Sequence, residues 1–320
     1  MKRIKHRKKS RKRVLLAIEF LAFFILLIAI YSSAKKKLDD TFPQVSDTGS
    51  WGNKINLQDL YSPTSILLDA DTGEMLAEHD SNKRIYPASL TKIMTALLAI
   101  ENTEDLEQSI VLPEAIFTDL YAQNASMAGF LPGEYVKMKD LLYGILLPSG
   151  AECCIAFAEQ VAGSEAQFVE MMNQKAEALE MYNTHFSNST GLHDQGQYST
   201  VKDISTLLQY ALKNAEFREV FTSRQYSAGY SQMHPEGVTF YSTMFEKMDG
   251  LNIQGGEIIG GKTGYTDESG LCLASLALVN GREYILVTAK AKGTHDTEPY
   301  HIMDAVRVYG QISKITGSKG

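Results

Sequence analysis

Strand-like apolar runs lie near both ends of the body of this chain, and a mainly helical region separates them. The first pair spans residues 65–78 around the turn signal Asp71-Thr72-Gly73, and the second spans residues 271–290 around Asn280-Gly281. Apolar runs joined by such turns predict β-hairpins. Residues of about 104–215 have helical spacing instead. We therefore expect an α+β fold, in which an antiparallel sheet is built from both ends of the domain, is flanked by helices and carries a mainly helical insertion.

The expected helices are separated by clear breaks. Pro148-Ser149-Gly150 interrupts the apolar pattern in the middle of the insertion and predicts a turn between two helices. The stretches with helical spacing are Leu90 to Leu98, Asp140 to Leu147, Ala151 to Val161, Ala166 to Met181 and Pro299 to Ile312.

Charge is distributed unevenly along the 320 residues. The first 13 residues hold nine of the 31 Lys and Arg residues and no acid. The rest of the chain has 22 bases and 38 acids, a net charge of −16. Nucleic-acid binding depends on Lys and Arg that neutralise phosphates, so we do not expect a nucleic acid as a partner.

The basic head precedes an 18-residue apolar run, residues 14–31, that only Glu19 interrupts. A basic flank is retained in the cytoplasm, so the body is expected outside the cell membrane. Ser32-Ser33-Ala34 offers a possible signal-cleavage site, but the run exceeds the core of a usual signal peptide. We favour an uncleaved membrane anchor, with secretion after cleavage as the alternative.

These features predict a division of the chain into five parts. They are a cytoplasmic basic head (1–13), a transmembrane anchor or signal segment (14–31), a linker (32–61), a catalytic domain (62–313) and a tail (314–320).

Three cysteines do not make a disulfide framework. Cys153 and Cys154 are adjacent in an apolar helical stretch, and Cys272 lies in a strand-like run, so we expect small buried side chains. No Cys/His cluster indicates a metal, and no cofactor is expected.

Ser89-Leu90-Thr91-Lys92 is the first motif with chemistry. A serine hydroxyl is a weak nucleophile that needs an adjacent base. Ser89 and Lys92 are three residues apart, which puts both side chains on one face of a helix. A helix N-terminus also favours developing negative charge at Ser89. A serine that merely caps a helix has the same local pattern.

Two further motifs follow. Ser149-Gly150 lies at the break between two helices. Such a turn can present the Ser149 hydroxyl into a cleft, and the alternative is that Ser149 is an ordinary turn residue. Lys262-Thr263-Gly264 precedes an apolar strand. Its ammonium and hydroxyl suit an anionic substrate, and its glycine allows close approach of a substrate backbone. Taken alone, this motif is also compatible with an exposed turn.

In this order, Ser-x-x-Lys, Ser-Gly-x and Lys-Thr-Gly resemble the signature of penicillin-binding and β-lactamase enzymes. The surrounding sequence is similar to D-alanyl-D-alanine carboxypeptidases of low molecular mass over roughly residues 62–312. The segments that carry this resemblance are Asp71-Thr72-Gly73, Tyr86 to Thr95, Asn188 to Leu192, Tyr198 to Thr200 and Gly261 to Thr266.

The resemblance implies a β-lactamase/transpeptidase-like fold and a serine peptidase. The implied substrate is a peptidoglycan stem peptide ending in D-Ala-D-Ala, with β-lactams as covalent inhibitors. Lys92 takes the proton of Ser89, which attacks the peptide carbonyl, and Ser149 relays a proton to the leaving amine. Lys262 and Thr263 hold the terminal carboxylate, and Gly264 lets the substrate backbone approach closely.

The resemblance also assigns the oxyanion hole to the backbone N–H groups of Ser89 and Tyr265. A donor of this kind contributes roughly 2.7–4 kcal/mol.

The middle motif departs from the family, which usually has Ser-x-Asn, because Ala151 stands at the third position. A methyl group neither holds the substrate amide nor hydrogen-bonds Lys92. We therefore expect reduced efficiency with an unchanged type of reaction.

Three alternatives are weighed against this hypothesis. A class A β-lactamase adds a glutamate in a Glu-x-x-Leu-Asn pattern, which Glu177 to Asn183 lacks. Glu298 and His301 have the Glu-x-x-His spacing of a zinc D,D-peptidase. The upstream zinc motif is missing, because Thr200 stands where it needs an aspartate, and we expect a surface pair. A non-catalytic receptor for wall peptides or β-lactams needs a signalling part, for which a head of 13 residues is too short.

Overall fold

The computed structural model describes residues 55–248 and 251–317, all within one unit of the chain, Gly49–Gly320. Its main sheet has five antiparallel strands in the order β2-β1-β9-β8-β7. The strands are β2 (Met75–His79), β1 (Thr64–Asp69), β9 (Arg282–Ala291), β8 (Leu271–Val279) and β7 (Gly256–Gly264). The first strand thus pairs with the last one, and the expected sheet built from both ends of the domain is confirmed.

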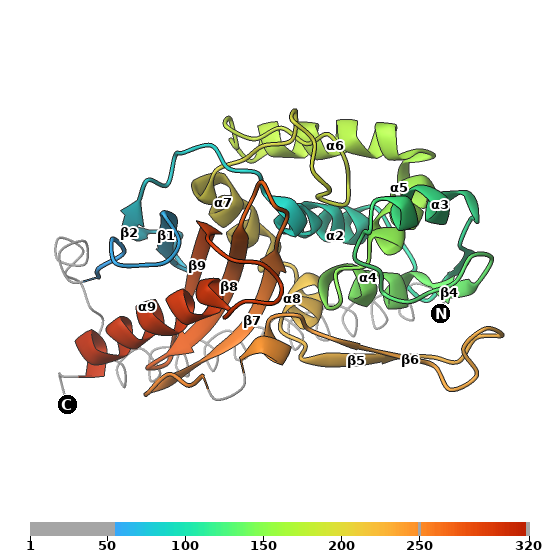
Figure 1. Cartoon of the computed structure of the whole chain (residues 1–320). Helices are drawn as coiled ribbons and strands as arrows, with labels where there is room; N and C mark the ends of the chain where they lie inside the picture. Colours follow the sequence, from blue (N-terminus) through green and yellow to red (C-terminus); the bar gives the residue numbers. More distant parts are fainter. Residues whose placement is uncertain (1–54, 249–250, 318–320) are drawn as a thin grey trace, which may run out of the picture. The chain divides into compact units, whose positions relative to one another are not determined.

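Helices cover both faces of this sheet (Figure 1). On one face, α9 (Tyr300–Gly317) packs along β7, β8 and β9, and the Tyr309 hydroxyl lies 3.0 Å from Ser275 Oγ of β8. Neighbouring Ala274 and Leu276 belong to the main apolar core on the other face, because successive side chains of a strand point in opposite directions. Helix α7 (Val201–Ala211) packs on that second face against β1 and β9.

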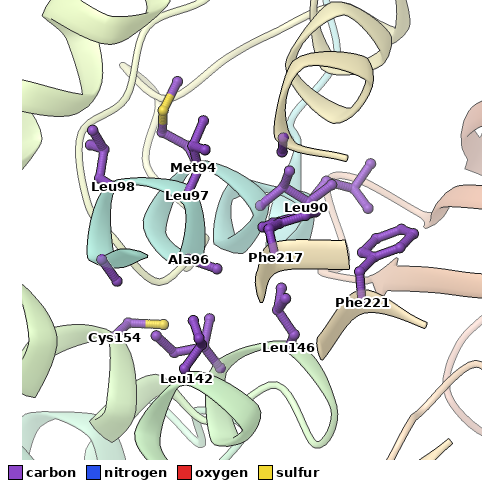
Figure 2. Close-up of a cluster of buried hydrophobic side chains, with 14 of the residues drawn as sticks. Leu90, Met94, Ala96, Leu97, Leu98, Leu142, Leu146, Cys154, Phe217 and Phe221 are labelled. Atoms are coloured by element: carbon purple, nitrogen blue, oxygen red, sulfur yellow. The ribbon is translucent and has the colours of Figure 1, made fainter. Parts of the chain in front are cut away.

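Helix α2 (Lys92–Glu101) is the centre of the apolar core, and all its residues from Lys92 to Ile100 are buried. Figure 2 shows Ala96 on the side of α2 that faces Leu142 of α4 (Met138–Leu146) and Cys154 of α5 (Ala151–Ala162), whereas Met94, Leu97 and Leu98 lie on the opposite side. Leu90, just before the helix, lies near Phe217 of α8 (Ala215–Phe221). A helix that is apolar all round is stable only when other elements surround it. The packing of α2 therefore holds the start of the helix, where the first motif lies, in a rigid setting.

The helical insertion has the three helices expected within it, with small shifts of their ends. They are α4 (Met138–Leu146), α5 (Ala151–Ala162) and α6 (Glu165–Ala178). Three further helices, whose bounds were not predicted, are α3 (Ala115–Ala122), α7 and α8 (Ala215–Phe221).

Two small two-stranded sheets were not expected. They are β3 (Ser109–Val111) with β4 (Tyr135–Lys137), and β5 (Gln225–Ala228) with β6 (Val238–Tyr241). Strands of three and four residues are too short to show a period of two in the sequence.

The basic head, the predicted membrane segment of residues 14–31 and most of the predicted linker lie outside the described residues. At the end of the predicted linker, Ile55 and Leu57 are buried, and the Asn56 N–H donates to Gln311 of α9. Among the described residues, no helix has the length and apolarity needed to cross a membrane. The three cysteines are free and buried, as predicted.

Candidate active site

Ser89 and Lys92 lie side by side at the start of α2. The sequence predicted that Ser89 is in the first α-helical turn, but Ser89 lies in the 3₁₀ turn η1 (Ala88–Thr91), which leads into the helix. Residues three apart are eclipsed in a 3₁₀ turn. Lys92 Nζ accordingly donates a hydrogen bond of 3.3 Å to Ser89 Oγ.

The amine of Lys92 is removed from solvent. The side chain is 2% exposed, and Nζ donates to the Thr190 carbonyl at 2.5 Å. Burial lowers the pKa of Lys92, and the nearby Cys154 and Glu152 counteract this shift in part. A lysine that loses its charge in this way becomes a base for the adjacent hydroxyl.

Ser149 occupies the break between α4 and α5 in an uncommon conformation. Its φ is +71°, although it is not a glycine, and a left-handed residue of this kind is costly unless its surroundings hold it. The next N–H groups do so, since Gly150 N donates to Gly144 O and Ala151 N donates to Ser126 O, both at 2.8 Å. Ser149 Oγ is buried without a hydrogen-bond partner, so its hydroxyl is available to a ligand.

Lys262, Thr263 and Gly264 form the end of β7, the edge strand of the sheet. Lys262 is 0% exposed, and its Nζ donates to the Thr263 carbonyl at 3.0 Å. Burial and the charge of Lys92 hold the pKa of Lys262 well below its usual range. Thr263 instead reaches a pocket, where its Oγ1 lies 2.6 Å from the Thr243 hydroxyl.

The end of β7 also packs against the backbone of the nucleophile. A Cβ at Gly264 would lie 3.1 Å from the Ser89 nitrogen and 3.3 Å from the Leu90 nitrogen. Tyr265 follows directly and lines the same pockets as Ser89. The two backbone positions that the sequence assigned to an oxyanion hole are therefore neighbours in space.

Two pockets meet at Ser89. The first, of about 100 Å³, is lined by Ser149, Thr243, Thr263 and His301 among others. The second, of about 500 Å³, is lined by Lys92 and Ala151 among others. A substrate that reacts at Ser89 thus has space on two sides of the nucleophile, and Lys262 lines neither of these two pockets.

Three residues that contribute to the site were not predicted from the sequence. Thr190 lies in a segment that resembled the family, but nothing local indicated that its carbonyl meets Lys92. Thr243 carries no motif. Glu152 follows the second motif; it is fully buried, and its Oε1 accepts from the N–H groups of Ala128 at 2.7 Å and Gly129 at 3.0 Å.

The carboxylate of Glu152 therefore holds the loop that carries Ser126, a residue that lines both pockets. Burial raises the pKa of Glu152, and the backbone N–H donors oppose that shift.

Comparisons with known proteins give a consistent result. A family model described as D-alanyl-D-alanine carboxypeptidase matches residues 52–293. The chain is 35% identical over 218 residues to D-alanyl-D-alanine carboxypeptidase DacF of Bacillus subtilis, covering 67% of this chain and 53% of that protein. It is 29% identical over 251 residues to DacD of Escherichia coli, with 75% and 61% covered. The chain thus spans little more than half of the length of these relatives.

Solved structures are similar over most of the chain. The crystal structure of the Streptomyces K15 DD-transpeptidase has a TM-score of 0.69 and 26% identity, covering 78% of this chain and 97% of that one. A D-alanyl-D-alanine carboxypeptidase from Mycobacterium tuberculosis H37Rv has a TM-score of 0.69 and 25% identity, with 80% and 92% covered. The predicted transpeptidase-like fold is confirmed.

Proposed function

The chain belongs to the D-alanyl-D-alanine carboxypeptidase family, and on this premise we propose that it is a serine carboxypeptidase that removes the terminal D-alanine from cell-wall stem peptides. The observation that carries the proposal is the buried amine of Lys92, which is 3.3 Å from Ser89 Oγ and has a lowered pKa. No metal or cofactor takes part in the proposed reaction.

In the first half of the reaction, neutral Lys92 takes the proton of Ser89 while Oγ attacks the carbonyl carbon of the penultimate D-alanine. Negative charge develops on the carbonyl oxygen, and the backbone N–H groups of Ser89 and Tyr265 stabilise it. The peptide C–N bond then breaks. Ser149, whose hydroxyl has no other partner, receives the proton that Lys92 took and passes one to the leaving amine, so Lys92 becomes neutral again.

In the second half, water attacks the ester carbon of the acylated Ser89, and Lys92 accepts a proton from that water. The ester bond to Oγ breaks, Oγ regains a proton, and the shortened peptide leaves. Lys262 and Thr263 are proposed to favour binding of the terminal carboxylate, and Gly264 leaves room for the substrate backbone next to Ser89.

β-Lactams are proposed as covalent inhibitors, because attack of Ser89 on the lactam carbonyl opens the ring and leaves an ester on Oγ. The test is mass spectrometry of the full-length protein after exposure to penicillin, with the labelled peptide mapped. One penicilloyl group on Ser89, absent from Ser89→Ala, is expected. An adduct on another serine would refute the assignment.

We also propose that the catalytic domain, residues 62–313, lies outside the cytoplasmic membrane and is anchored through residues 14–31. The supporting features are the basic head and the apolar run in the sequence. Cell fractionation should recover the protein with the membrane. A mature protein in the medium whose N-terminus is near Lys35 would show that the segment is a cleaved signal.

A further inference from the structure

His301 is buried, although its sequence context predicted an exposed residue. The sequence predicted a surface pair with Glu298 on the last helix, and this prediction is wrong for His301. The residue is the second of α9 and only 2% exposed. Its Nδ1 is buried and has no hydrogen-bond partner. A buried polar atom without a partner is uncommon and calls for a ligand, a water molecule or a functional role.

The imidazole lines the smaller pocket beside Ser89 together with Thr263 of β7 and Thr243 of the loop before η2. The hydroxyl oxygens of Thr243 and Thr263 are 2.6 Å apart, and Ser149 Oγ is a second buried polar atom of this pocket without a hydrogen-bond partner. Thr263 adjoins Gly264, against which Ser89 packs. We assign the terminal D-alanine, the proposed leaving group, to this pocket because Thr263 lines it and does not line the larger one.

The charged lining of the pocket is mixed, with Lys247 as its cation and Glu246 as its carboxylate. Lys247 lies in η2 (Phe245–Lys247), and its Nζ donates to the His295 carbonyl at 3.0 Å. Tyr265 and His295 complete the titratable lining beside His301. Burial, followed by the charges of Lys247 and His295, lowers the pKa of His301 to about 3. The ring is therefore neutral at physiological pH and carries one N–H, so it acts as a hydrogen-bond donor while Lys247 supplies the positive charge.

We propose that His301 is a specificity-determining residue that hydrogen-bonds the terminal carboxylate of the leaving D-alanine, beside Thr243 and Thr263. This inference rests on the function proposed above. Lys262 is buried and does not line the pocket. His301 and the two hydroxyls then make the direct contacts, and Lys262 acts on the carboxylate without touching it.

The test compares two N-acylated peptides that end in D-Ala-D-Ala and differ only in a C-terminal carboxylate or carboxamide. The readout is the ratio of their kcat/KM values in the full-length protein. His301→Leu removes the donor, and the ratio should fall roughly tenfold to a hundredfold through loss on the carboxylate peptide. His301→Gln retains an N–H donor and should keep part of the preference.

His79→Gln is the control, since it removes an imidazole from β2, at the opposite edge of the sheet from β7. It should leave the ratio unchanged. A folded, penicillin-reactive His301→Leu protein with the wild-type ratio would overturn the inference and leave the proposed function intact. A wild-type protein that hydrolyses neither peptide and takes up no penicillin would instead contradict the proposed function.

A second measurement needs no change at His301. In Ser89→Ala with ¹⁵N-labelled histidine, the carboxylate peptide should shift the ring resonances of His301 more than the carboxamide peptide does. Equal shifts with both bound peptides would show that the ring does not contact the carboxylate, and would reject the assignment even if the leucine variant does not fold.

Discussion

Gly191 packs directly on the carbonyl oxygen of Ala88, so closely that a Cβ at position 191 would lie 2.1 Å from that oxygen and 2.9 Å from the Ser89 nitrogen. This contact joins the two segments that meet at Lys92. One carries the nucleophile, and the other carries the Thr190 carbonyl that accepts from Nζ. The backbone geometry of the site thus depends on the absence of a side chain.

Gly191→Ala should therefore disrupt the site. The residue has φ +82°, and the added methyl group meets backbone atoms that have no room to move. Left-handed strain alone costs about 1–3 kcal/mol. We expect penicillin acylation to fall by more than about a hundredfold.

Gly133→Ala is the matched control for that change. Its φ of +78° imposes similar strain, but the nearest atom is Met233 Cε at 3.8 Å. This variant should lower the melting temperature while acylation stays within about threefold. Equal acylation in the two variants would show that the contact with Ala88 is unimportant.

The pH dependence of acylation should report the state of Lys92. Only the neutral amine accepts the Ser89 proton, and burial lowers the pKa of Lys92. The rate should therefore rise with pH and level off below the usual pKa of lysine, about 10.4. Stopped-flow acylation by penicillin between pH 5 and pH 10 measures this, and a rise without a plateau would contradict the lowered pKa. Lys92→Arg should be inactive throughout, because arginine does not deprotonate.

Lys262→Ala should weaken turnover of peptides with a free terminal carboxylate more than that of amidated ones. A bound carboxylate favours the charged form of the neighbouring Lys262 amine, so the loss for the carboxylate peptide should be roughly tenfold or more. Steady-state kcat/KM on the two peptides is the measurement. Lys137→Ala, which removes an exposed lysine of β4 that is paired with Glu107, serves as the control. Equal losses on both peptides would refute the carboxylate role of Lys262.

Ala151→Asn should raise the acylation rate by up to roughly tenfold. Ala151 is buried, lines the larger pocket and offers no polar group to Lys92 or to a substrate amide. An asparagine would add a donor for the substrate carbonyl and an acceptor for the lysine. The measurement is the acylation rate of the wild-type protein and of Ala151→Asn, with the melting temperatures of both to verify folding. A folded variant that is no faster would show that the Thr190 carbonyl already does what the asparagine would do.

The sequence by itself determined those parts of the protein that depend on near neighbours in the chain. Ser89 and Lys92 could be paired because residues three apart face the same side of any helical turn, α or 3₁₀. The bounds of β8 agree with the apolar run that predicted them, because a strand covered on both faces is apolar throughout. The turn at Asn280-Gly281 could be predicted because Asn-Gly is favoured where both turn residues take positive φ, as they do here.

Only the tertiary structure decided which distant groups complete the site. Helical periodicity indicated which face of α9 is buried, but it contains no information about the pocket at the start of the helix, so His301 was taken for a surface residue. The Thr190 carbonyl has no signature in a sequence, because every residue has one. Thr243 and Thr263 meet through the packing of η2 and its flanking loop on β7. Such contacts depend on how complete elements pack, which no local pattern of residues records.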